Sequence, residues 1–245
     1  MNADVCAGDA ALKEWVDSAL SKNDVVILSE THGTREAPET FLRMVCAALA
    51  SQESIVIGME LPDTAMDAVR RMVTPDDLRE SSYWMNAHDG RTSTANLKLL
   101  ARLLMLEKSG AVKLIGFDIR ATGGEPFGQD AGKFIREVIA QAGGSKALLL
   151  MGRGHADFTS GNNSISHYLS AAGYRTLVVD LQTSGGEAWV CRMGVCGVSS
   201  APDTGCGEPT SVPILLSATD GIRQHATMCA GKSNASEPAT GRDEA

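Results

Sequence analysis

Short apolar runs rich in β-branched residues alternate along this chain with longer segments in which apolar residues recur at helical spacing. The runs predict strands that are covered on both faces, because they lack the alternation of a half-exposed strand. They occupy residues 25–30, 55–61, 113–118, 146–151 and 175–181. Helices are predicted at residues 10–20, 36–50 and 97–108, after Pro62, from the loop 123–129 to residue 142, and at 165–172. Strands and helices in alternation are typical of βαβ units with parallel pairing.

The last quarter of the chain departs from this pattern. Residues 187–196 and 213–219 predict further strands, separated by the turn-rich stretch 199–211. Residues 231–245 are rich in Ser, Ala, Glu and Gly without an apolar period, and they predict a disordered tail. We therefore expect residues 1–230 to form a single α/β domain, with a mainly parallel central sheet flanked by helices and extra C-terminal strands.

Composition narrows the classes of partner. The formal net charge is -8, with 22 Lys and Arg residues and no basic block, which disfavours a nucleic-acid partner. No apolar run approaches the roughly 20 residues that a membrane-spanning helix needs, so we expect no span. The opening residues, MNADVCAGDA, show no signal-peptide pattern. The sequence leaves the compartment and the oligomeric state open.

The six cysteines allow three interpretations. Disulfides rank first, because the count is even and four of the cysteines fall in the loop-rich C-terminal region. Free buried thiols rank second, and structural zinc third, because no C-x-x-C pair is present. If the cysteines are paired, we expect a periplasmic or secreted protein.

Four predicted strands are followed at the same end by an ionisable residue, namely Glu30, Glu60, Asp118 and His155. In an open α/β sheet the carboxyl ends of parallel strands meet at one crevice, where such folds bind ligands. The repetition therefore predicts an active or binding site at this edge. The polar segment 74–94 predicts a short helix and a loop that covers the crevice.

The densest group of reactive side chains lies in residues 30–36, ETHGTRE. Glu30 and His32 are two residues apart on extended chain, so their side chains point to the same side. A partly buried Glu beside a His is an acid–base pair. Glu36 has an alternative structural role, because a carboxylate at the start of a helix is favoured by the helix dipole.

The other carboxylates also have structural alternatives. A carboxylate at the end of a buried strand must be hydrogen-bonded or paired. Glu60 would then form a salt bridge with Arg91 or Arg35, and Asp118 would pair with Arg120. We favour the site interpretation for Glu60, because Glu30 and Asp118 repeat its placement.

Glu30, His32, Glu60 and His155 together offer nitrogen and oxygen ligands that suit zinc, manganese or iron. The sequence does not decide whether a cofactor is bound. A divalent metal suits these residues better than haem, because no tyrosine can be assigned as a haem ligand. The chain has no G-x-S-x-G elbow, no Walker loop and no G-x-G-x-x-G after a strand, which disfavours serine hydrolases and nucleotide enzymes.

Five motifs between residues 24 and 182 follow one another in a familiar order, namely LSETHGTREAP, IGMELP, DGRTSTANLKLL, LIGFDIR and LLLMGRGHA. They resemble the motifs of the erythromycin-esterase and ChaN-like (Tiki, haem-binding uptake) superfamily. The resemblance implies an α/β core with one cleft lined by acidic and histidine residues. It also implies that His32 activates water with Glu30 and Glu60 as carboxylate partners, and that His155 is the later histidine of the cleft.

These observations lead to a hydrolase hypothesis. His32, oriented by a neighbouring carboxylate, takes a proton from a water that attacks an ester or amide carbonyl of a small molecule or peptide. Arg35 or Arg91 stabilises the oxyanion, and His155 positions the water or protonates the leaving group. The alternative is a ChaN-like protein that binds haem or a metal without catalysis.

Overall fold

The computed structural model describes residues 6, 9–51, 54–71, 77, 83–84, 90–118, 127–192, 195–206, 208–210, 212–218 and 223–236. Most of the segment 74–94, predicted to cover the crevice, lies outside these residues, as do Arg120 and residues 237–245.

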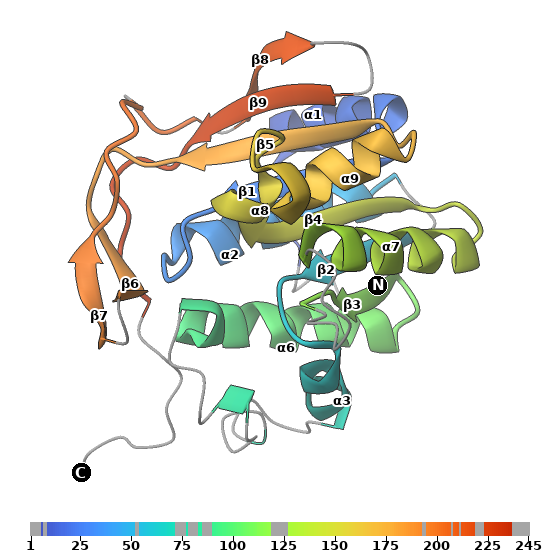
Figure 1. The fold of residues 1–245 in the computed structure, drawn as a ribbon, viewed down its shortest axis with the longest axis horizontal. Helices are drawn as coiled ribbons and strands as arrows, with labels where there is room; N and C mark the ends of the chain where they lie inside the picture. The colour runs from blue at the N-terminus through green and yellow to red at the C-terminus, as the bar shows by residue number, and fades with distance from the viewer. Residues whose placement is uncertain are drawn as a thin grey trace.

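A mostly parallel sheet forms the centre of the molecule, with strand order β3-β2-β4-β1-β5-β9-β8 (Figure 1). Its parallel strands are β1 (Val25–Glu30), β2 (Ile55–Met59), β3 (Val112–Gly116), β4 (Lys146–Gly152), β5 (Thr176–Gln182) and β9 (Arg223–Cys229). The edge strand β8 (Ile214–Ala218) runs antiparallel to β9. A separate antiparallel pair, β6 (Glu187–Arg192) and β7 (Val195–Ser200), lies beyond the arrowheads of β5 and β9.

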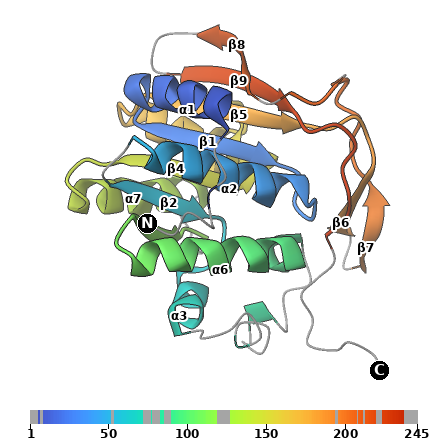
Figure 2. The ribbon, with the colours of Figure 1, turned by 180° about the vertical axis from the view of Figure 1, so that it is seen from behind.

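Helices cover both faces of the sheet. One face carries α7 (Phe127–Gln141), the single turn α8 (Arg153–Ala156) and α9 (Ile165–Ala171), which lie in front in Figure 1. The other face carries α1 (Ala10–Lys22), α2 (Glu36–Leu49) and α6 (Thr94–Lys108), seen in front in Figure 2. The helix α3 (Asp63–Arg71) contacts β3 and α6 at one edge, and the 3-10 turns η1 (Gly90–Thr92) and η2 (Gly161–Asn163) complete the described helical segments.

The apolar pattern of the sequence accounts for this arrangement. Every residue of β1 is buried, as the unbroken apolar run requires for a strand covered on both faces. Side chains alternate along each strand, so Leu28 packs with the α2 and α6 layer while Ile27 packs with the α7 and α9 layer. Asp9 and Ser93 accept backbone N–H groups at the starts of α1 and α6, which fixes where these helices begin.

The predicted fold class is confirmed. The predicted strand at 187–196 proves to be the β6–β7 hairpin, in which Trp189 pairs with Val198. The pattern gave no sign of β9, because RQHATMC is polar over its first half. Tertiary pairing makes this segment a strand, since β9 lies between β5 and β8 and bonds to both.

The prediction of a disordered tail from residue 231 is wrong for residues 231–236, which we call the C-terminal strap. Ser233 and Ser236 are 3% and 2% exposed, and Ala235 forms a bridge with Thr34. The strap is held largely by backbone hydrogen bonds, which do not depend on side-chain hydrophobicity. Composition alone therefore could not distinguish it from an unstructured tail.

Two pairs of cysteines are joined in disulfides, as the first-ranked interpretation predicted. Cys6 is bonded to Cys46 on α2, and Cys206 is bonded to Cys229 at the end of β9. Cys196 is also disulfide-bonded, and none of the described cysteines is free. Paired cysteines indicate an oxidising compartment. No helix in the described ranges has the length and apolar character needed to cross a bilayer.

We expect unreduced protein unfolded in guanidinium to show no free thiol with a chromogenic thiol reagent. After reduction the six cysteines should titrate, and the melting temperature of the folded protein should fall in reductant, because cross-links restrict the unfolded chain. Six reactive thiols before reduction would contradict the pairing.

Candidate functional site

The ionisable residues predicted to share one edge do meet there. β1 ends in Glu30, whose position in the ladder is opposite Gly152 at the end of β4. Glu60 directly follows β2, the other neighbour of β4. The chain after Gly152 forms α8, which carries His155 above the same edge. The parallel register therefore places two carboxylates on either side of one glycine.

His32 lies between these carboxylates. Its Nδ1 is 2.9 Å from Glu30 Oε1, and its Nε2 is 3.6 Å from Glu60 Oε2. The ring is packed against the end of β4, because a Cβ atom at Gly152 would lie 2.6 Å from His32 Nε2. The next residue, Gly33, has φ +83 and contacts the Trp189 backbone where a Cβ would collide, so the turn requires glycine.

Glu60 connects the two histidines to an arginine. It is 6% exposed, and its Oε2 accepts a 2.8 Å hydrogen bond from the Gly152 N–H. Its Oε1 lies 3.5 Å from Arg91 Nη1 and 3.9 Å from His155 Nε2. The same Arg91 nitrogen donates to Asp118 Oδ2 at 2.8 Å. Arg91 therefore pairs with both buried carboxylates, as one structural alternative proposed for Glu60, and Asp118 is brought into the same cluster.

The two carboxylates set the charge of His32. Burial on its own would lower the pKa of His32, but the hydrogen bonds and negative charges of Glu30 and Glu60 raise the pKa to about 10. Burial would raise the pKa of Glu60, but the hydrogen bond and charge of His32, together with the Gly152 N–H, lower the pKa to about 2. At neutral pH His32 is an imidazolium whose two N–H groups face carboxylates.

The raised pKa of His32 disfavours its role as the general base, which stays a prediction. A base must offer a nitrogen lone pair, and an imidazolium has none. The Glu30 carboxylate also favours the charged form of His32. Its second oxygen, Oε2, is buried without a hydrogen-bond partner in the described part of the chain. His32 acts instead as a fixed positive charge that neutralises two buried carboxylates.

His155, unlike His32, has one ring nitrogen held by a backbone carbonyl and the other available for proton transfer. Its Nδ1 lies 3.1 Å from the carbonyl oxygen of Asn163, which can only accept, so Nδ1 carries the proton. Nε2 is therefore the ring nitrogen left for proton transfer, and it lies 3.9 Å from Glu60 Oε1. The ring packs on Phe127 at 4.3 Å between centroids and its side chain is 34% exposed. Sequence analysis missed Asn163 and Phe127, because neither belongs to a motif and only the fold brings them to His155.

The short helix α8 is held in place from two sides. Arg153 Nε donates to Asp180 Oδ1 on β5 at 3.0 Å, and Ser29 Oγ donates to the same oxygen at 3.0 Å. On the other side, Ser166 on α9 donates to the Ala156 carbonyl at 2.5 Å. These contacts fix the orientation of the helix that carries His155.

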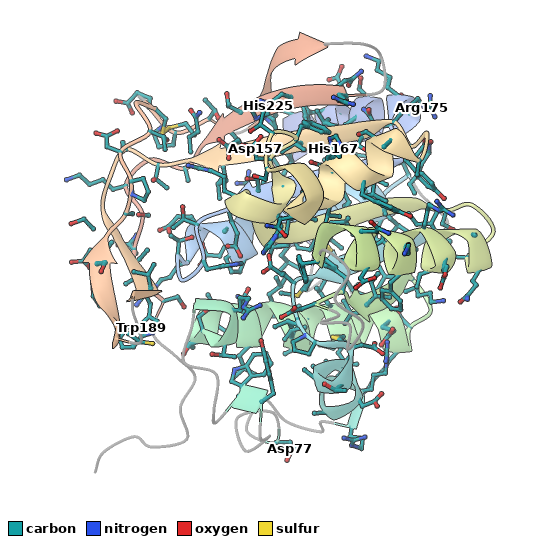
Figure 3. The ribbon with its side chains drawn as sticks, viewed as in Figure 1. Asp77, Asp157, His167, Arg175, Trp189 and His225 are labelled. Carbon is teal, nitrogen blue, oxygen red and sulfur yellow. A yellow bond between two sulfur atoms is a disulfide. The ribbon has the colours of Figure 1, made fainter. Side chains whose placement is uncertain are left out.

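Arg35 does not join the cluster, contrary to the expectation that it stabilises an oxyanion. Its side chain is exposed, and its Nε donates to the Ala235 carbonyl at 3.0 Å. Of the two arginines considered, Arg91 is the one at the site. Two further histidines lie on other elements, His167 on α9 and His225 on β9, where His225 is near Asp157 (Figure 3).

The donor set does not fit a divalent metal. Within the described residues, no group of three or more His, Cys, Asp or Glu side chains is arranged to hold an ion. Both His32 nitrogens face carboxylate oxygens, and Arg91 already supplies positive charge to Glu60 and Asp118. Glu30, His32, Glu60 and His155 come together as predicted, but as a network of internal ion pairs and not as a set of metal ligands.

No family model matches the chain, and no curated protein matches it. Among solved structures, the chain is similar to the structure of the type III effector HopBA1, with a TM-score of 0.54 and 12% sequence identity. The match covers 96% of this chain and 100% of that chain. At this identity the likeness supports the α/β fold alone. The resemblance of the sequence motifs to erythromycin esterases and ChaN-like proteins stays a prediction.

The charge state of the cluster predicts how stability depends on pH. The folded pKa of His32 is raised above 6.5, so its stabilisation is complete below pH 6.5 and is lost as the pH rises through about 10. The pKa of Glu60 is lowered from 4.5, so its stabilisation is complete above pH 4.5 and is lost as the pH falls through about 2. Urea unfolding should show that His32→Gln lowers the free energy of unfolding most between pH 4.5 and pH 6.5. The loss of free energy should become progressively smaller above pH 6.5. A cost that stays constant up to pH 10 would contradict the charged state of His32.

The contact between Gly152 and His32 predicts that Gly152→Ala displaces the imidazole. The backbone at Gly152 has φ -63 and ψ 146, which alanine adopts freely, so any loss of stability comes from the collision. Overpacking of this kind costs about 1–3 kcal/mol. The matched control is Gly154→Ala, where an added Cβ meets nothing within 4 Å. Equal melting temperatures for the two variants would contradict the close packing of His32 on β4.

Proposed function

We propose that the protein is a hydrolase in which His155, and not His32, is the general base that activates water for attack on an ester or amide carbonyl. The observation that carries the proposal is the orientation of His155. Its Nδ1–H is held by the Asn163 carbonyl, and its Nε2 is directed to the partly exposed edge where Glu60, His32 and Arg91 meet. A base oriented by a second group and placed beside fixed charges is the arrangement that acid–base catalysis requires.

The proposed reaction proceeds in two proton transfers. His155 Nε2 takes a proton from water as the water oxygen bonds to the carbonyl carbon, and the carbonyl oxygen becomes an oxyanion. The tetrahedral intermediate then collapses, and the His155 imidazolium returns the proton to the departing alcohol or amine. Glu60, 3.9 Å from His155 Nε2, stabilises the imidazolium between the two steps.

His32 and Arg91 have an electrostatic role in this proposal. The hydrogen bond and charge of His32 lower the pKa of Glu60 and keep it ionised, and Arg91 Nη1 lies 3.5 Å from the same carboxylate. The two cations also offset negative charge of Glu30, Glu60 and Asp118 at a site where the two side chains are only partly exposed, 27% for His32 and 16% for Arg91. Positive charge in such a setting stabilises a developing oxyanion more strongly than it would in water.

The substrate of the proposed reaction is a small molecule or a peptide, and the paired cysteines favour a periplasmic or secreted setting. The alternative function expected from the sequence, binding of haem or a metal without catalysis, gains no specific support from the arrangement of these side chains.

We expect His155→Gln to lower kcat by about 10²–10⁴-fold, the contribution typical of general-base catalysis, with little change in melting temperature. Activity is first located with a panel of ester and peptide substrates, run with and without a chelator. His167→Gln is the matched control, because His167 lies on α9 and is not one of the ion-paired residues described above. An active wild type with an equally active His155→Gln variant would rule out His155 as the base. Loss of activity in chelator would show that the reaction needs a metal.

A further inference from the structure

We propose that the C-terminal strap, residues 231–236, is part of the functional site, and that Asn234 and Ser236 are positioning residues that keep His32 between Glu30 and Glu60. The catalytic consequence of this inference rests on the proposed function, but the structural claim does not. The strap contacts the turn that carries His32, the first turn of α6, which follows Arg91, and the segment that leads into β6.

The strap is anchored first to residues 184–187, the segment that leads into β6. The Gly231 carbonyl accepts from the Ser184 N–H at 2.8 Å. Ser233 then exchanges backbone hydrogen bonds with this segment, donating to Gly185 at 3.0 Å and accepting from Glu187 at 2.9 Å. Figure 1 shows this last part of the described chain running beside β6, away from the central sheet. The anchor directs the following residues toward the end of β1.

The strap next fixes the turn after His32. The Gly33 carbonyl accepts two hydrogen bonds, from the Trp189 N–H at 3.0 Å and from the Ser236 N–H at 2.7 Å. Trp189 lies on β6, as labelled in Figure 3. The Asn234 carbonyl accepts from the Arg35 N–H at 3.0 Å, so the backbone on both sides of Thr34 is held. The turn that orients His32 therefore owes its backbone contacts to residues about two hundred positions later.

A side-chain clamp reinforces this contact. The Glu36 carboxylate accepts from the Asn234 backbone N–H at 3.1 Å and from Asn234 Nδ2 at 2.7 Å. Glu36 was expected either to act at the site or to favour the start of a helix. It begins α2, as the second option requires, and its carboxylate also holds the strap.

Ser236 joins the two cationic parts of the site. Its backbone N–H holds the His32 turn, while its Oγ accepts from the Ala95 N–H at 3.0 Å in the first turn of α6. Arg91 lies just before this helix, and its carbonyl accepts from Asn96 Nδ2 at 3.1 Å. The Arg91 turn also contacts the His32 turn directly, because a Cβ at Gly90 would lie 2.6 Å from the His32 carbonyl carbon.

Through these contacts the strap affects both the backbone of the Gly33 turn and the ion pairs of His32. If the strap separates, the Gly33 turn loses one of two backbone donors and the clamp at Glu36. His32 is then free to move away from Glu30 and Glu60, which are 3% and 6% exposed and would remain as buried negative charges. Docking of the strap and placement of the imidazolium therefore stabilise each other.

The experiment compares Ser236→Pro with Ser236→Ala in the full chain. Proline removes the N–H that donates to Gly33, whereas alanine keeps it, and both remove the Oγ that caps α6. Proline also fits an extended preceding residue, as Ala235 is in its bridge with Thr34. The difference between the two variants therefore isolates the hydrogen bond to the turn.

The first readout is the pair of imidazole N–H proton signals of His32. The 2.9 Å hydrogen bond to Glu30 should shift the Nδ1–H signal downfield, and the ion pair with Glu60 at 3.6 Å should slow exchange of the Nε2–H proton. We expect Ser236→Ala to retain them and Ser236→Pro to lose them while circular dichroism stays native. The second readout is kcat/KM, expected to fall about 10²-fold in Ser236→Pro with most of the loss in kcat, as for a misplaced catalytic group.

A second pair of variants covers the case in which Ser236→Pro does not fold. Glu36→Ala removes the clamp, and Glu39→Ala is its control, because both glutamates lie in the first turn of α2 and share its dipole term. Glu36→Ala alone should weaken the His32 signals. Retention of the signals in a folded Ser236→Pro protein, or equal spectra for the two glutamate variants, overturns the inference. If the wild type hydrolyses no substrate but shows the His32 signals, and Ser236→Pro loses them, the inference is supported while the hydrolase proposal is rejected.

Discussion

The ion pairing of His32 with Glu30 and Glu60 is the interaction on which the rest of the site depends. The parallel register of β1, β4 and β2 brings two carboxylates to one buried edge, where unpaired charges would be too costly. A single imidazolium, that of His32, forms an ion pair with each of these carboxylates. Arg91 adds a second positive charge at Glu60. Gly152 leaves room for this ring, and the turn at Gly33 follows it directly. The two carboxylates beside the ring raise the pKa of His32.

Much of the fold could be read from the sequence because strands buried on both faces have a plain apolar signature. That signature located the five apolar strands of the sheet and their helices, and parallel topology then placed Glu30, Glu60, Asp118 and His155 at one edge. It failed for β9 and for the C-terminal strap. Both are held by backbone pairing with distant segments, which leaves no periodic trace in composition.

The chemistry of the site was harder to predict than its location. The motifs implied Glu30 and Glu60 as carboxylate partners of His32, but not that the fold places one carboxylate at each ring nitrogen. The second carboxylate turns a potential base into a fixed cation. Likewise, nothing local separates Arg35 from Arg91 as a partner for Glu60, since only the path of the strap shows which arginine is occupied elsewhere.

Long-range closure of the His32 turn by the strap also has a consequence for biosynthesis. A chain leaves the ribosome from its N-terminus, at about 5–20 residues per second, so β1 and its glutamate emerge long before Ser236. Early strands can pair as they appear, yet the imidazole stays without its final restraint until translation has passed residue 236. A nascent polypeptide would therefore fold over much of its length before the turn after His32 gains its backbone contact with Ser236.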